Sequence, residues 1–209
     1  MTPRRADSAA VQVAAVRHMS ERAGEYIVTV AVEGRSIMVA LDVDQVEHAR
    51  RAELEVGAVC SRRLLHALWE LPANVTWPIC GLDPADLVAY SEATQGLVEI
   101  NGEGLVRRYQ PAGTVRAIGV RRARLIDAVR QVASFPGIFG RYAFASRRSS
   151  TDDQAAAAAS TLGVGAAIAR SSGLVVIADA SPPEVGLPGV YRWWLAETAY
   201  DAWLQESAH

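Results

Sequence analysis

Residues 107–148, RRYQPAGTVRAIGVRRARLIDAVRQVASFPGIFGRYAFASRR, form the most basic stretch of the chain. The stretch holds ten of the 21 arginines and a single acid, Asp127, which gives it a formal charge of +9. The remaining residues carry 11 arginines and 22 acids, and the total charge is −2. Such an asymmetry more often reflects a partner or an anionic ligand than a requirement of folding.

The same stretch predicts a helix and a strand. The apolar residues of 120–133 recur at helical spacing, and the arginines of that segment fall on the other side of the helix. Phe135-Pro136-Gly137 ends the helix. Residues 140–146 predict a strand that passes through Tyr142 and Phe144.

On both sides of this stretch, the sequence predicts a series of helices and β-hairpins. The elements expected before it are a helix over 9–23, a hairpin of 26–32 and 36–43, a helical pattern from Asp44 to Leu71 broken near Gly57, a helix that begins at Asp83-Pro84, and a hairpin of 97–100 and 105–109. The elements expected after it are a helix over 151–162, a hairpin of 163–169 and 174–180, and a helix over 191–204.

These elements predict an α+β protein, in which short antiparallel hairpins and a mixed sheet pack with five to six helices. A division into residues 1–95 and 96–209 is expected, and one continuous domain is the alternative. Trp193 and Trp203 fall at helical spacing on the last helix, which is typical of a core stripe or of a contact between two copies of the chain.

Composition restricts the class of protein. The chain has 209 residues, half of them apolar, which is enough for a globular core. No signal peptide and no transmembrane segment is expected, so the predicted location is the cytoplasm. Cys60 and Cys80 have no CxxC and no histidine at zinc-ligand spacing, so no metal site and no cofactor are predicted.

The basic stretch and its flank supply the candidate binding residues. Guanidinium groups bind phosphates in a bidentate manner, and the interleaved aromatic side chains can stack on bases or fill the core. The alternatives are a solvated helix face that pairs with the chain's own acids, and a surface for an acidic protein partner. The predicted nucleic-acid-binding residues are Arg107, Arg108, Arg121, Arg122, Arg124, Arg147 and Arg148.

Two smaller groups of residues allow both a functional and a structural interpretation. The run 147–151, RRSST, precedes a helix start and fits a phosphate cradle, but Asp152 and Asp153 in the first turn favour an ordinary helix cap. Asp42, Asp44 and His48 could ligate a divalent metal, but a capping role for Asp44 is simpler.

The run YAFASRRSSTDDQAAAAASTLGVGAAI, residues 142–168, lies in a segment, 120–180, that resembles the later part of PD-(D/E)XK restriction-endonuclease-like domains. The resemblance implies that 141–146 is the strand that carries the acid-x-lysine pair, and that Gln154 is the glutamine of the following helix. Ala143, Phe144 and Ala145 stand at the catalytic positions instead, and the chain has no lysine. The resemblance thus implies a catalytically silent copy.

The predicted function is non-catalytic binding of nucleic acid or another polyanion. The resemblance implies a degenerate nuclease-like domain from a bacterial mobile-element or defence system. The enzymatic alternative is a divergent metal-dependent nuclease that uses Asp127, Asp152 or Asp153. The third alternative is a subunit of a protein assembly, which binds an acidic protein or a second copy of the chain.

Overall fold

The structure is a computed structural model that describes residues 15, 18–19, 26–93, 96–102, 104–146, 148–170, 173–184 and 189–208. The fold is α+β, as the sequence predicts. The described residues form six α-helices, a mixed six-stranded sheet and a three-stranded antiparallel sheet. In the described part of the chain no helix combines the length and the apolar character that crossing a membrane requires.

The chain forms two compact units that are interleaved in sequence. Unit 1 comprises residues 1–42 and 115–187, and unit 2 comprises residues 43–114 and 188–209. The division differs from the expected boundary near residue 95, which falls inside unit 2. The reason is that the chain leaves the large sheet after its second strand and returns to the same sheet some 70 residues later.

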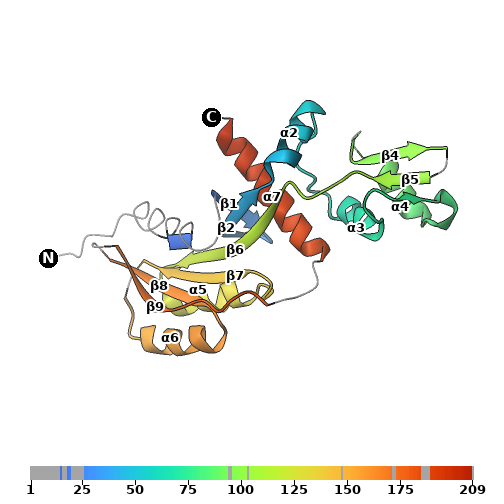
Figure 1. Ribbon diagram of the computed structural model, residues 1–209. Helices are drawn as coiled ribbons and strands as arrows, with labels where there is room; N and C mark the ends of the chain where they lie inside the picture. Colours follow the sequence, from blue (N-terminus) through green and yellow to red (C-terminus); the bar gives the residue numbers. More distant parts are fainter. Residues whose placement is uncertain are drawn as a thin grey trace. The chain divides into compact units, whose positions relative to one another are not determined.

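Unit 1 is organised by the six-stranded sheet, whose order is β1-β2-β6-β7-β8-β9 (Figure 1). The strands are β1 Tyr26–Val32, β2 Arg35–Val43, β6 Gly113–Arg122, β7 Gly140–Ala145, β8 Gly165–Arg170 and β9 Gly173–Ala178. β6, β7 and β8 are parallel to one another. The pairs β1/β2 and β8/β9 are antiparallel hairpins, so both predicted hairpins are confirmed.

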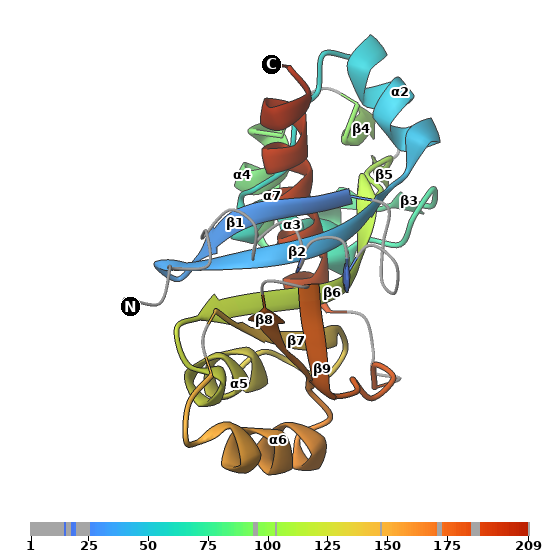
Figure 2. The ribbon, with the colours of Figure 1, turned by 90° about the vertical axis from the view of Figure 1, so that its left-hand side faces the viewer.

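Helices α5 (Leu125–Ala133) and α6 (Asp152–Thr161) connect the parallel strands and lie on one face of the sheet (Figures 1 and 2). On the other face, Ala15 and Met19 pack with buried residues of β2, β6, β7 and β8. The predicted helix over 9–23 lies mostly outside the described residues, although Ala15, His18 and Met19 are helical.

The turn of the first hairpin shows how local sequence sets the register. Glu33 and Gly34 both have positive φ angles, 50° and 73°, which two-residue hairpin turns of the right twist require. Val32 consequently pairs with Arg35, and Tyr26 pairs with Leu41 at the far end of the hairpin. Alternate residues of β1 are therefore buried, as the sequence pattern predicts.

The predicted helix over 120–133 begins too early. Residues 113–122 form the strand β6, and helix α5 begins only at Leu125. Arg121 and Arg122 are therefore strand residues and not residues of a helix face. The first half of β6 alternates between buried and exposed positions, and its second half is buried between neighbouring strands, where pairing with β7 overrides the helical spacing.

Unit 2 contains four helices, a 3₁₀ turn and the small sheet, whose strand order is β3-β5-β4. The elements are α2 Gln45–Glu53, α3 Arg62–Glu70, β3 Thr76–Trp77, η1 Ile79–Gly81, α4 Pro84–Ser91, β4 Val98–Asn101, β5 Gly104–Arg107 and α7 Val190–Ser207. Their apolar side chains form one core, which includes Leu65, Leu68 and Leu105. The predicted helices and the 97–109 hairpin of this region are confirmed, with a longer break between α2 and α3 than expected.

Side-chain caps fix the starts of the unit 2 helices. The Asp44 carboxylate accepts hydrogen bonds from the amides of Val46 and Glu47, and Asp83 accepts from Ala85 ahead of α4. Both caps agree with the sequence prediction. Ser61 caps α3, and Cys60 precedes that helix and is exposed.

Candidate functional site

The parallel strands of unit 1 bring arginines to one edge of the sheet. β6 ends at Arg121 and Arg122, Arg124 follows it, and Arg148 follows the end of β7. The register places Arg122 opposite Ala145 of β7, so these strand ends lie side by side. We call Arg121, Arg122, Arg124 and Arg148 the arginine edge. The carboxyl edge of parallel strands is where open α/β sheets commonly bind their ligands.

Two further features belong to the same edge. Arg170 is the last residue of β8, the third parallel strand, so its backbone also ends there. Helices α5 and α6 are the next elements after β6 and β7, and helix N-termini carry a partial positive charge. The strand order therefore collects positive charge at a single edge from the ends of β6 and β7.

The members of the arginine edge differ in their bonding. Arg124 forms an exposed ion pair with Asp127, at 2.7 Å between Nε and Oδ2. Arg122 donates from Nη1 to the carbonyl oxygen of Arg121, at 3.3 Å. Arg148 is exposed and forms no ion pair with any described residue. Two of the four guanidinium groups, those of Arg122 and Arg148, thus lack a carboxylate partner among the described residues.

Arg107 and Arg108 do not belong to the arginine edge. Both lie in unit 2, where the guanidinium of Arg107 lies over the ring of Trp193 and donates to the carbonyl oxygen of Leu68. Burial lowers the pKa of Arg107. Arg108 forms an exposed ion pair with Glu99 at 2.8 Å. Arg147 lies outside the described residues, so the structure brings together four of the seven predicted arginines.

The charge of the chain divides with its two units. Unit 1 carries 14 arginines and 10 acids, a net charge of +4, whereas unit 2 carries 7 arginines and 13 acids, a net charge of −6. Eight of the ten arginines in residues 107–148 belong to unit 1. An anionic ligand is favoured at unit 1 and disfavoured at unit 2.

The N-terminus of α6 is satisfied by the chain itself. The amide of Ser149 donates to Oδ2 of Asp152, and the amide of Thr151 donates to Oγ of Ser149. The helix opens at Thr151, as predicted, but the Thr151 side chain makes no cap hydrogen bond. These bonds favour the helix-cap interpretation of the 147–151 run. An anion at this edge would contact the arginines more readily than the amides of α6.

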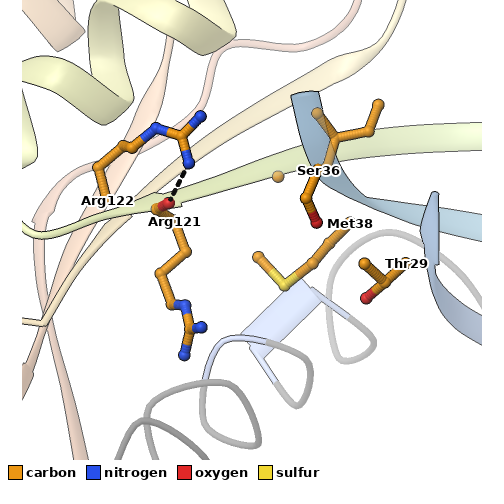
Figure 3. Close-up of a pocket in the computed structure, with 7 residues that line it drawn as sticks. Thr29, Ser36, Met38, Arg121 and Arg122 are labelled. Carbon is orange, nitrogen blue, oxygen red and sulfur yellow. Dashed lines mark hydrogen bonds between the residues drawn. The ribbon is translucent and has the colours of Figure 1, made fainter. Parts of the chain in front are cut away.

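A small pocket lies at the carboxyl end of β6 (Figure 3). Its volume is about 150 Å³. Its described lining contains no acid and consists of Thr29, Ser36, Ile37, Met38, Gly119, Arg121 and Arg122. Sequence reasoning missed the two hydroxyl residues. The signal was available, because Thr29 and Ser36 are polar residues within apolar strands.

Unit 2 contains a buried network of charged side chains that the sequence analysis did not identify. Arg51 is fully buried and forms an ion pair at 2.8 Å with Glu197 and another at 2.8 Å with Glu47. Glu197 also accepts from the hydroxyl of Tyr109 and from the amides of Val59 and Ala112. Burial and the carboxylate of Glu197 raise the pKa of Tyr109, which therefore stays neutral.

The network has a structural role. Its guanidinium lies 5.5 Å from the ring centroids of both Tyr109 and Tyr200, and no part of Arg51 reaches solvent. A substrate could not reach groups that are this deeply enclosed. The network joins α2, the loops on either side of the small sheet, and α7, so it fixes the ends of unit 2 to one another.

Cys60 borders this network, and its thiol should react slowly. Cys60 has an exposed surface, but its sulfur lies 4.0 Å from the carbonyl oxygen of Glu197 and is partly desolvated. This desolvation, with the nearby carboxylates of Asp201 and Glu197, raises the pKa of Cys60 to about 11. At pH 8 we expect iodoacetamide to alkylate Cys60 in the Cys80→Ser variant about 100-fold more slowly than it alkylates N-acetylcysteine, because few thiolates are present. The rate should rise toward pH 11. A rate at pH 8 equal to that of the free thiol would contradict this pKa.

The three side chains that could have ligated a metal ion, those of Asp42, Asp44 and His48, each bond to another group of the protein. Asp42 pairs with Arg116, Asp44 caps α2, and Nδ1 of His48 lies 2.8 Å from the hydroxyl of Tyr200. Among the described residues, there is no group of three or more His, Cys, Asp or Glu side chains that could hold a metal ion.

The resemblance of residues 120–180 to restriction-endonuclease-like domains stays a prediction. β7 supplies the expected strand and α6 the expected helix, with Gln154 exposed on it. The geometry of the arginine edge does not depend on that resemblance. Comparison with known proteins adds no relative: no protein-family model, no curated protein and no solved structure matches the chain.

Proposed function

We propose that unit 1 binds nucleic acid without cleaving it, and that the arginine edge contacts the phosphate backbone. The observation that carries the proposal is the arrival of Arg121, Arg122, Arg124 and Arg148 at one edge from two adjacent parallel strands. Phosphates along a strand recur at regular spacing, so a row of cations suits a polymer better than a single small anion.

Hydrogen bonds and ion pairs within the protein leave the arginine edge able to bind phosphates. The Arg124–Asp127 pair is exposed, and exposed pairs typically contribute 0 to about 1 kcal/mol. A guanidinium has five N–H donors, so one that already contacts a neighbour can still donate to a phosphate oxygen. The charge of +4 on unit 1 adds long-range attraction for a polyanion.

The nuclease alternative has less support from the geometry. Asp127 is paired with Arg124, and one oxygen of Asp152 accepts from the Ser149 amide. Both oxygens of Asp127 accept from Arg124, so Asp127 would have to give up that pair to hold a metal ion. The second oxygen of Asp152 is buried without a partner, which is the feature that keeps this alternative open to test.

A role in protein assembly is the second candidate function, and an exposed apolar set in unit 2 favours it. The large hydrophobic side chains of unit 2 that are more than two-fifths exposed are Val46, Leu54, Val75, Trp77, Ile79, Val88 and Ile100. Trp77 and Ile100 both pair with Leu105, so they lie on one face of the small sheet. Exposed apolar sets of this kind are common at protein contacts.

A binding assay tests the proposal. We expect fluorescence anisotropy of labelled duplex DNA, single-stranded DNA and RNA to give dissociation constants of about 10⁻⁴ to 10⁻⁶ M, the range of backbone contact. Incubation with Mg²⁺ or Mn²⁺ should leave the labelled strands intact. Absence of binding to all three at low salt would overturn the proposal, and metal-dependent cleavage would replace it with the nuclease alternative.

A further inference from the structure

The pocket at the end of β6 contains hydroxyl groups that the proposed contact between the arginine edge and the phosphate backbone does not use. Thr29 pairs with Met38 across the first hairpin, and Ser36 lies two residues before Met38 on the same strand face. Gly119 and Arg121 lie two residues apart on β6, the strand next to β2, so they share one face of that strand. The pocket therefore lies across three adjacent strands, with two hydroxyl groups on one side and arginine on the other (Figure 3).

Its size limits what it can hold. Pockets for drug-sized ligands have volumes of about 300–1,000 Å³, whereas this one has about 150 Å³. A water molecule occupies about 30 Å³ of liquid, so the pocket has room for a group of a few heavy atoms with some water. A base with its sugar does not fit. A single tetrahedral oxyanion does.

The residues that line the pocket favour a ligand with a negative charge. The hydroxyls of Thr29 and Ser36 are exposed and can donate, and the guanidinium of Arg121 can only donate. Arg122 is the next residue of the strand, and its guanidinium turns to the other side, where it donates to the carbonyl oxygen of Arg121 (Figure 3). The described lining contains no carboxylate that would repel an anion. Gly119 lines the pocket with its backbone, and a Cβ atom at this position would lie 2.5 Å from Sδ of Met19, which would then have to shift.

We infer that this pocket binds a phosphate monoester, and that in the nucleic-acid complex it takes the phosphorylated end of a strand. The inference rests on the proposed function for the source of the phosphate. Internal phosphates are diesters with one negative charge, whereas a terminal monoester carries up to two and has three free oxygens. A pocket with several donors from two sides therefore prefers the end of the strand over its interior.

The test compares strands that differ only at their ends. Anisotropy is measured with one labelled oligonucleotide in three forms: 5′-phosphate, 3′-phosphate, and hydroxyl at both ends. We expect one phosphorylated form to bind about tenfold more tightly than the hydroxyl form, as charge-assisted hydrogen bonds allow. The double variant Thr29→Val/Ser36→Ala should lose that preference and keep the affinity for the hydroxyl form.

A matched control variant separates the pocket from surface hydroxyls in general. Ser160→Ala removes an exposed hydroxyl near the end of α6, away from the arginine edge, and should leave the end preference unchanged. Equal binding of all three forms by the unmodified chain would overturn the inference. So would an end preference that the Thr29→Val/Ser36→Ala variant retains.

A second measurement does not need nucleic acid. Titration of the ¹⁵N-labelled chain with inorganic phosphate should shift the amide signals of Thr29, Ser36 and Gly119, and the double variant should lose these shifts. Such shifts without any nucleic-acid binding would support the monoester site and remove the proposed function. End-independent nucleic-acid binding without shifts would remove the monoester site and leave the proposed function.

Discussion

Replacement of Arg51 with methionine is expected to lower the free energy of unfolding by about 3–5 kcal/mol, because it leaves buried carboxylates without their cation. Arg51 and Glu197 are both fully buried, and Arg51 donates to Glu197 through two nitrogens, each at 2.8 Å. Methionine fills much of the same volume, so the loss comes from charge and not from a cavity. Urea denaturation measures it.

Intrinsic fluorescence follows this transition in unit 2 alone. All five tryptophans lie in that unit: Trp69, Trp77, Trp193, Trp194 and Trp203. A matched control is Arg108→Met, which breaks the exposed pair with Glu99 and should cost less than about 1 kcal/mol. Equal and small effects of the two variants would contradict a structural role for the buried network.

A double variant distinguishes the ion pair from general damage. If the unpaired carboxylate is the source of the loss, Arg51→Met/Glu197→Gln should be less destabilised than the sum of the two single variants. A coupling of about 1–3 kcal/mol is expected for groups in direct contact. The glutamine can still accept the hydrogen bonds of Tyr109 and the Val59 amide. Additive effects would indicate that the pair contributes nothing.

Replacement of Arg122 and Arg148 with glutamine is expected to weaken nucleic-acid binding about 10- to 100-fold at 0.1 M salt, because two phosphate contacts are lost. These residues are chosen because neither pairs with a described carboxylate, so their substitution leaves no acid unpaired there. The affinity is measured by fluorescence anisotropy, and circular dichroism confirms that the fold is kept.

The control for this variant removes the same charge from the same unit. Arg116 lies in the first half of β6 and Arg130 in the last turn of α5, both away from the carboxyl edge of the sheet. The variant Arg116→Gln/Arg130→Gln should weaken binding only slightly, through long-range attraction. A loss equal to that of the Arg122/Arg148 variant would show that net charge, and not the arginine edge, determines binding.

Local signals predicted most of the elements. The Glu33-Gly34 turn, the Asp83-Pro84 helix start and the tyrosine and phenylalanine of β7 each act over a few residues, so sequence alone identifies them. The end of β6 was different. Residues 120–122 continue the helical spacing of α5, and only their pairing with β7 makes them a strand.

The candidate site could be predicted only in part for the same reason. The clustering of arginines in sequence was visible, but the structure assigns Arg107 and Arg108 to unit 2 and the others to the strand ends of unit 1. Thr29 and Arg121 line one pocket although 92 residues separate them in sequence. Arg51 and Glu197 are 146 residues apart. No local pattern encodes contacts of that range.

The salt dependence of binding tests the arginine edge most directly. Each neutralised phosphate changes the slope of log K against log salt concentration by about −0.9 on duplex DNA. Contact by four arginines predicts a slope of about −3 to −4 for the unmodified chain, and a slope shallower by about 2 for Arg122→Gln/Arg148→Gln. A slope near zero, or an identical slope for the two proteins, would contradict phosphate contact at this edge.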